Sequence, residues 1–251
     1  MGMKLNIAII TLFLGACCAF PSLGQSYNFV NYSISDGLVH DRIVDLCTDH
    51  YGNIWAATLG GGISRFNGTS FENITIKDGL ASNYVRSVLV DGQGRLWAAT
   101  AEGISIYDGR EFTNFRVARE EEHNSVHTLF EDSQGNVWFS AFGGNLGRID
   151  PAGQQIDFLQ FPRISDNDNI IDIDQDRTGR IWLLSSIQGL ISYSDGEFKN
   201  ELENRELGGF ILSLQNHQDT LWMGTNKGII RFIPDQQEGN LEFMTSMQNM
   251  F

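Results

Sequence analysis

Five tryptophans recur at nearly constant spacing, and this limits how the chain can fold more than any other feature. They follow one another at intervals of 42, 41, 44 and 40 residues. Before each of the first four, an Asp stands six residues earlier and a Gly three residues earlier, so each copy reads D-x-x-G-x-(Ile/Leu/Val)-Trp. In the last copy those places hold Asn216 and Asp219. A period of this length is typical of a chain built from repeated supersecondary units. The repeated residues are Trp55, Trp97, Trp138, Trp182 and Trp222, with Asp49, Asp91, Asp132 and Asp176.

The sequence around each Trp predicts a β-hairpin. An Asp carboxylate can accept hydrogen bonds from backbone N–H groups two residues on, and Gly supplies the positive φ that a tight turn needs. In the second copy, β-forming runs at 85–90 and 96–99 flank the turn, and 103–109 and 111–115 supply a third and a fourth strand. Four strands in about 40 to 45 residues is the signature of a propeller blade. We therefore predict an all-β fold, a β-propeller of four-stranded antiparallel blades with five blades present. The tryptophans would be core wedges between adjacent sheets.

The two ends of the repeat array bear on how a ring could close. Residues 27–38 resemble 71–80, which we assign as the fourth strand of a blade and its exit loop. The fifth copy has its own candidate fourth strand at 241–245, so no blade is left to receive the N-terminal strand. We therefore expect the sequence to be the first part of a larger ring of about seven blades. The alternative is a complete five-bladed ring in which the N-terminal strand is added to one blade.

The N-terminus has the pattern of a secretory signal. One positive charge at Lys4 precedes an apolar run over 5–20 that is short for a membrane span. We predict a signal peptide over 1–25, blades over 26–251, and a periplasmic or extracytoplasmic location. The alternative is lipoprotein processing, in which Cys17 is lipidated. On the first route only Cys47 of the three cysteines remains, so no disulfide framework forms, and we predict Cys47 to be a small buried residue.

Composition narrows the class of partner. Hydrophobic residues make up 41% of the chain, enough for a globular core. The 27 Gly and only 4 Pro suit an all-β protein with many turns and few lost ladder donors. The net charge of −14 argues against a nucleic-acid partner, because such binding draws its affinity from clustered Lys and Arg.

Two stretches carry a family resemblance. Residues 54–68 read IWAATLGGGISRFNG and residues 96–109 read LWAATAEGISIYDG. They resemble the two-component regulator propeller repeat, and the resemblance extends over essentially all of 27–246. It implies the extracytoplasmic sensor of a membrane-bound bacterial regulator, most familiarly a hybrid histidine kinase. Such a module binds a small-molecule ligand, often an oligosaccharide, and is not itself an enzyme. The resemblance also implies a dimer in the intact sensor and a membrane helix downstream of this sequence.

One face of the predicted propeller is the candidate ligand site. The first strand of each blade runs from the return loop to the D-x-x-G turn, so the return loops share a face with the loops between the second and third strands. Residues there are free to vary for recognition, and aromatic, amide and charged side chains suit a sugar. The alternative is that they are ordinary surface loops. The predicted ligand-binding residues are His40, Arg42, Asn83, Tyr84, Glu102, His123, Phe142, Asn145, Gln188 and Lys227.

We expect no cofactor, no metal and no catalytic set. His123 and His127 are four residues apart, but they fall on a loop and a strand and lack a third ligand. The acidic run Asp172-Ile173-Asp174 lacks the Gly and Glu of a calcium loop. Two alternatives to a sensor stay open. One is a propeller lyase or hydrolase, for which His40, Glu102 and His123 are the acid–base candidates; the other is a propeller that docks a protein.

Overall fold

The repeat folds into the predicted hairpins. The computed structural model describes residues 29–117, 124–165, 167–203, 210–234 and 241–244. Contacts divide the chain into one unit ending at Tyr32 and a second from Ser33 to Phe251, and the blades belong to the second. The predicted signal peptide with Cys17, and His123, lie outside the described residues. No helix in the described part is long and apolar enough to cross a membrane.

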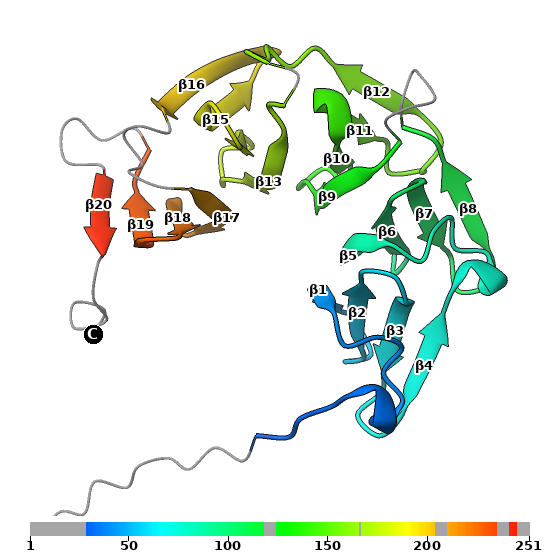
Figure 1. Ribbon diagram of the computed structural model, residues 1–251. Helices are drawn as coiled ribbons and strands as arrows, with labels where there is room; N and C mark the ends of the chain where they lie inside the picture. Colours follow the sequence, from blue (N-terminus) through cyan, green and yellow to red (C-terminus); the bar gives the residue numbers. More distant parts are fainter. Residues whose placement is uncertain (1–28, 118–123, 166, 204–209, 235–240, 245–251) are drawn as a thin grey trace, which may run out of the picture. The chain divides into compact units, whose positions relative to one another are not determined.

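Five sheets of four antiparallel strands follow one another in chain order, which confirms the predicted blades (Figure 1). In every blade the strands are neighbours in sequence order, joined by hairpins. The strands are β1 (Ile43–Thr48), β2 (Ile54–Thr58), β3 (Gly62–Phe66) and β4 (Phe71–Ile74); β5 (Val85–Val90), β6 (Leu96–Thr100), β7 (Gly103–Tyr107) and β8 (Phe112–Phe115); β9 (Val126–Glu131), β10 (Val137–Ala141), β11 (Asn145–Ile149) and β12 (Ile156–Leu159); β13 (Ile170–Gln175), β14 (Ile181–Ser185), β15 (Gly189–Ser194) and β16 (Glu197–Glu203); β17 (Ile211–His217), β18 (Thr220–Thr225), β19 (Gly228–Phe232) and β20 (Leu241–Met244).

The first strand of each blade lies on the inner side. β1 contacts β5, β5 contacts β9, β9 contacts β13, and β13 contacts β17. Figure 1 shows these strands along the concave side, with the fourth strands on the outside. The ends of all five inner strands that adjoin the return loops therefore meet around one rim, which we call the inner rim.

Each interface between neighbouring blades encloses one Trp. Trp55, Trp97, Trp138 and Trp182 each belong to a cluster of buried residues shared with the following blade. These four side chains are at most 6% exposed. Trp222, in the last blade of the sequence, is only partly buried. The four buried indoles are thus the wedges between sheets that the spacing predicts.

The repeated Asp of the first four copies fixes both the turn and the indole. In the second blade, Asp91 Oδ1 accepts from the backbone N–H groups of Gln93 and Arg95, and Oδ2 accepts from Trp97 Nε1. The other three Asp-containing copies repeat this arrangement, with indole Nε1 to Oδ2 distances between 2.7 and 3.1 Å. In the fifth blade a two-residue turn, Gln218–Asp219 with φ of 51° and 57°, replaces the motif. Asn216 donates to the Gln175 carbonyl instead.

An arginine covers the indole in four blades, and it comes from one of two places. In blades two and four it is the fifth residue of the turn, and in blades one and three it faces the Trp from the third strand. Where the third strand supplies the Arg, the fifth turn residue is Asn53 or Asn136, whose side-chain amide donates to the turn Asp. The guanidinium carbons lie 5.2 to 5.7 Å from the ring centroids, a cation–π distance. The arginines are Arg65, Arg95, Arg148 and Arg180.

The loops that lead into the first and second blades each contain a short 3-10 helix. η1 (Ile34–Asp36) and η2 (Ile76–Asp78) are each capped by a Ser or Thr and end at a Gly with φ near 105°. The following Leu38 and Leu80 are buried, at 4% and 3% exposed. The sequence Asp-Gly-Leu, at 36–38 and 78–80, therefore ends the helix at the Gly and places the Leu side chain in the core.

Two expectations about the first part of the chain differ from the structure. We expected 27–38 to be a fourth strand with its exit loop, but Phe29 to Tyr32, the first described residues of this segment, carry no strand. An extended segment becomes a strand only where a sheet edge supplies its hydrogen-bond partners. Cys47 is only partly buried and is a free thiol, whose pKa burial raises to about 12, with help from Asp45 and Asp49.

Candidate functional site

Equivalent hydrogen bonds tie the two sets of loops to each other in all five blades. The first residue after each Trp strand donates its N–H to the carbonyl of a return-loop residue, at 2.9 to 3.1 Å. The loop between the second and third strands therefore lies beside the return loop in every blade, as expected from the strand order. Of the predicted ligand residues, Arg42, Tyr84 and Phe142 take part in these bonds. The pairs are Leu59 with Arg42, Ala101 with Tyr84, Phe142 with Ser125, Ser186 with Asn169, and Asn226 with Phe210.

Three of the predicted ligand residues use their polar atoms to hold the loops. His40 Nδ1 accepts from the Arg42 N–H. Asn83 accepts from Ile76 N–H through its side chain and from two glycine N–H groups through its carbonyl. Gln188 Nε2 donates to the Asp168 carboxylate at 2.6 Å and to the Pro162 carbonyl. These residues shape the face more than they offer groups to a ligand.

Other predicted residues present their side chains to solvent. Arg42, Glu102 and Lys227 are exposed, and Tyr84 is 58% exposed. Arg42 and Tyr84 belong to neighbouring blades, which Leu59 joins through a backbone bridge to Tyr84. Glu102 and Lys227 belong to the second and fifth blades, so the structure does not bring all the predicted residues into one pocket.

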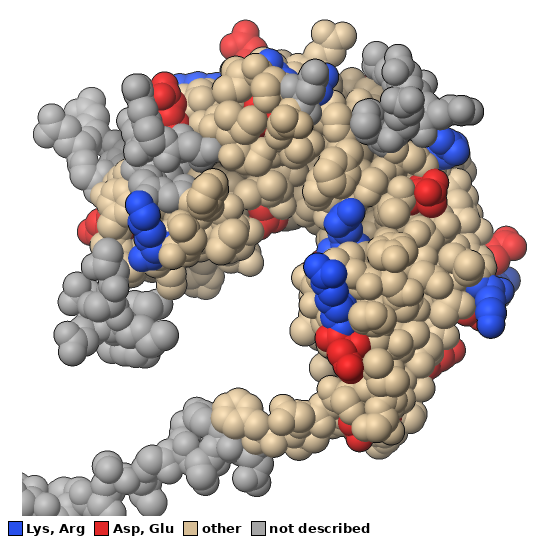
Figure 2. All heavy atoms as spheres, in the orientation of Figure 1, with Lys and Arg blue, Asp and Glu red and all other residues tan. Residues whose placement is uncertain are grey.

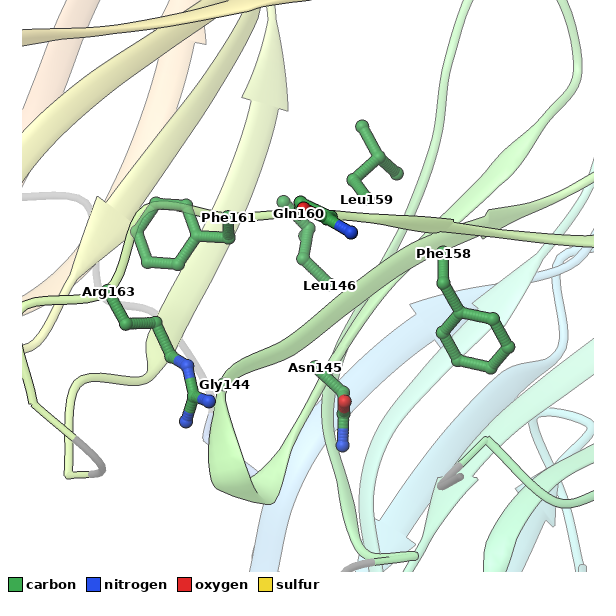
Figure 3. Close-up of a pocket in the computed structure, with 8 residues that line it drawn as sticks. All are labelled: Gly144, Asn145, Leu146, Phe158, Leu159, Gln160, Phe161 and Arg163. Atoms are coloured by element: carbon green, nitrogen blue, oxygen red, sulfur yellow. The ribbon is translucent and has the colours of Figure 1, made fainter. Parts of the chain in front are cut away.

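Asn145 lines a cavity of about 260 Å³ in the third blade (Figure 3). The other walls carry both polar and apolar groups and come from Gly144, β11, β12 and the segment after β12. Figure 3 shows the Arg163 guanidinium turned toward Gly144, and this group donates to the Gly143 carbonyl. Asn145 Nδ2 itself donates to the Phe142 carbonyl at 3.3 Å. The one charged group at this cavity is thus already engaged by the protein.

Phe142 lies in a cluster that loop-based reasoning did not find. The centroid of its ring lies 4.0 Å from that of the His127 imidazole, and the Arg86 guanidinium lies 5.4 Å from the same phenyl ring. Arg86 Nε also faces Ser125 Oγ at 3.4 Å. Arg86 is in β5 and His127 in β9, so the cluster joins the inner strands of the second and third blades to the loop carrying Phe142.

The charge of the inner rim differs between blades. Figure 2 shows basic side chains on the concave side of the first blades. Arg42 directly precedes β1, and Arg86 lies in β5. On the fourth blade the inner strand instead carries Asp172 and Asp174. Their carboxylates accept from backbone N–H groups of the fifth blade, at Leu214 and Asn216. The acidic run is therefore a tie between blades.

Asp172 gives this tie a pH dependence. Burial raises its pKa from 3.8 to about 6, and the nearby carboxylates of Asp174 and Asp45 add to the rise. A folded-state pKa above the unfolded one means that the carboxyl favours the folded state at low pH, and that this stabilisation is lost as pH rises from about 4 to about 6. We expect Asp172→Asn, which keeps an acceptor for Leu214, to raise the unfolding free energy by about 1–2 kcal/mol at pH 7.5 and to have little effect at pH 4. Urea unfolding at both pH values checks this, with Glu197→Gln on the exposed β16 as control; an equal gain at both pH values would contradict it.

No group of three or more His, Cys, Asp or Glu within the described ranges is placed to hold a metal ion. Of the acid–base candidates, His40 has one ring nitrogen engaged by Arg42, Glu102 is exposed, and His123 is outside the described residues. The geometry thus offers contacts for binding at the inner rim, and no described hydrogen bond or ion pair joins His40 to Glu102, the two candidates within the described residues.

Sequence comparison finds one family. Residues 37–60, 79–102 and 121–143 match the model described as the two component regulator propeller. Each match covers an inner strand, the D-x-x-G turn and the Trp strand of one of the first three blades. No curated protein sequence matches the chain.

Solved structures with low sequence identity share the fold. The extracellular domain assigned to a one-component system of B. thetaiotaomicron matches with a TM-score of 0.69 and 24% identity, over 88% of this chain and 34% of that one. This chain thus spans about a third of that domain's length. A catalytically inactive virginiamycin B lyase from Staphylococcus aureus matches with a TM-score of 0.70 and 15% identity, over 87% and 73%. PorZ, a surface component of the type-IX secretion system of Porphyromonas gingivalis, gives 0.63 and 14%, over 86% and 35%. These matches show a propeller architecture and leave the activity to be argued from the site.

Proposed function

We propose that this chain, three segments of which match the two component regulator propeller, is the ligand-sensing module of an extracytoplasmic bacterial regulator. In this proposal the module is exported, is not catalytic by itself, acts as a dimer in the intact sensor, and binds a small molecule, with carbohydrate the favoured class. Signal output would belong to other parts of the regulator.

The observation that carries the proposal is the contrast between backbone and side chains on the loop face. The five equivalent loop-to-loop bonds fix the backbone in the same way in each blade. The side chains that this backbone presents differ from blade to blade: the return-loop position holds Arg42, Tyr84 and Ser125 in the first three blades, and the position after the Trp strand holds Leu59, Ala101 and Phe142. A rigid scaffold carrying variable aromatic and charged groups is suited to recognition.

The test measures binding of a panel of oligosaccharides to the full chain, by thermal shift and by calorimetry. We expect saturable stabilisation by at least one sugar. Tyr84→Ala or Phe142→Ala should weaken that binding by about tenfold or more, the size expected when one aromatic contact of about 1.4 kcal/mol is lost. Tyr51→Ala is the matched control, because Tyr51 is 90% exposed but stands in a D-x-x-G turn at the opposite end of its inner strand. Equal loss from Tyr51→Ala, or no response to any sugar, would refute the proposal.

A lyase or hydrolase remains the second candidate from the sequence, but none of its described acid–base candidates gains support from the geometry. We therefore make no proposal of catalysis. Export and dimer formation are separately open to measurement by fractionation and by light scattering.

A further inference from the structure

A β-bulge occurs at the same place in all five blades. The pairing of each inner strand with its Trp strand skips one residue near the return-loop end. Bulges free a residue from the ladder and re-aim its side chain, and they occur often beside functional sites. The skipped residues are Val44, Arg86, His127, Ile171 and Leu212. Three are apolar, and only the second and third blades place a nitrogen-bearing side chain there.

These two side chains lie together although both are basic in type. Arg86 and His127 share Phe142 as a common support, at 5.4 Å and 4.0 Å. Burial, with a smaller contribution from the charge of Arg86, lowers the pKa of His127 to about 4. The imidazole is therefore neutral near pH 7. Among the described residues, no carboxylate forms an ion pair with Arg86 or His127.

Both side chains have hydrogen-bonding capacity that no described residue uses. His127 Nε2 is buried and has no hydrogen-bond partner among the described residues. Most arginines of the described part form ion pairs with Asp or Glu, as Arg65, Arg95 and Arg231 do. Arg86 forms none among the described residues, and its recorded hydrogen bond is the 3.4 Å contact with Ser125. A buried donor or acceptor without a partner destabilises the folded state, and a ligand oxygen between the two groups would remove that destabilisation.

We propose that Arg86 and His127 form the recognition site for the anionic group of the sensed ligand, a carboxylate or a sulfate, with Phe142 as the positioning residue. The guanidinium fork matches the two oxygens of such a group, and the imidazole N–H adds a third donor. The inference rests on the proposed sensing function and adds the ligand's charge to it. Because His127 Nε2 is buried, entry of the ligand requires Phe142 to move; Gly143 and Gly144 follow it, with φ of 76° and 69°.

The experiment uses the full chain with matched probes: a uronic-acid disaccharide, the neutral disaccharide of the same linkage, a sulfated disaccharide, and sodium sulfate against sodium chloride. Calorimetry measures affinity, and histidine ¹⁵N spectra report on His127. We expect an acidic disaccharide to bind at least tenfold more tightly than its neutral counterpart, and sulfate but not chloride to shift the His127 signals saturably. The carboxylate and sulfate arms show which oxyanion the site prefers.

Variants separate the site from the rest of the surface. Arg86→Gln and His127→Gln should each weaken binding of the acidic disaccharide at least tenfold, while Arg86→Lys, which keeps the charge and loses the fork, should weaken it less. Arg110→Gln, an exposed arginine in the loop after β7, is the control and should leave affinity unchanged. Circular dichroism and melting of each variant confirm folding before binding is measured.

The outcomes distinguish this inference from the proposed function. If the neutral disaccharide binds as tightly as the acidic one, or if Arg86→Gln leaves affinity unchanged, the anion site is refuted while a sensing role stands. If no sugar binds but sulfate shifts His127 in a manner lost in Arg86→Gln, the anion site stands and the carbohydrate part of the function fails. If neither sugars nor sulfate has an effect, the anion site is refuted.

Discussion

Trp97→Ala is expected to lower the unfolding free energy by about 3–5 kcal/mol, the range for truncating a buried aromatic side chain to Ala. Trp97 is fully buried in the cluster between the second and third blades, which includes Val126 and Phe139 of the third blade. The truncation therefore removes the wedge between two sheets and leaves a cavity that rigid sheets close poorly. A chain of this size has a total stability of about 5–15 kcal/mol, so the loss is a large fraction of it.

Two further substitutions test the cause. Trp97→Phe keeps much of the apolar volume but loses the Nε1–Asp91 bond, so we expect a smaller loss than for Ala. Trp222→Ala is the matched control, because that indole is only partly buried and has no Asp acceptor at the turn. Denaturant unfolding measures all three. If Trp222→Ala cost as much as Trp97→Ala, burial between blades would not be the source of the effect.

The sequence alone predicted the blades closely, for a physical reason. A turn that needs Asp and Gly, and a wedge that needs Trp, recur once in each blade, so the repeat period marks every hairpin. The sequence pattern places the five Trp strands at 54–58, 96–100, 137–141, 181–185 and 221–225. The first four have these bounds in the structure, and β18 begins one residue earlier, at Thr220, because a two-residue turn replaces the longer one.

The site was less predictable, because loop residues are the usual candidates for recognition, whereas Arg86 and His127 lie in strands. Arg86 and His127 stand five residues before the turn Asp of their copies, where the first and fourth copies have Val44 and Ile171. That contrast is readable in the sequence, but an inner strand is expected to carry scaffold residues. Only the bulge shows that this position leaves the ladder. Among the loop predictions, Phe142 joins the cluster, whereas Asn83 and Gln188 are engaged by the protein itself.

The repeat pattern also did not predict that the arginine over each indole comes from the turn in some blades and from the third strand in others. Each is unremarkable alone, since an Arg in a turn or on a strand is common. Only the pairing register shows that a third-strand Arg faces the Trp where the turn has Asn53 or Asn136. The coupling depends on contacts between strands, and a one-dimensional repeat does not state which strand residues are opposite each other.

The second large effect is expected for Asp91→Ala, with a loss of about 3–5 kcal/mol. The Asp91 carboxylate is 1% exposed and accepts four hydrogen bonds: from the N–H groups of Gln93 and Arg95, from Arg95 Nε at 2.7 Å, and from Trp97 Nε1. Alanine would leave these donors without an acceptor and the largely buried guanidinium without its counter-charge, and breaking such a pair from one side costs this much.

A double-mutant cycle with Arg95 shows how much of this loss comes from the ion pair. We expect Asp91→Ala to cost less in an Arg95→Met background than in the parent, because the unpaired charge is then absent, while the loss from the turn and the indole remains. Asp108→Ala is the control: that Asp also accepts two backbone N–H groups, from Arg110 and Glu111, but in an exposed turn. Urea unfolding of the set gives the answer. If Asp91→Ala were no more costly than Asp108→Ala, the repeated Asp would serve only the turn, and its bond to the indole would not contribute to holding neighbouring blades together.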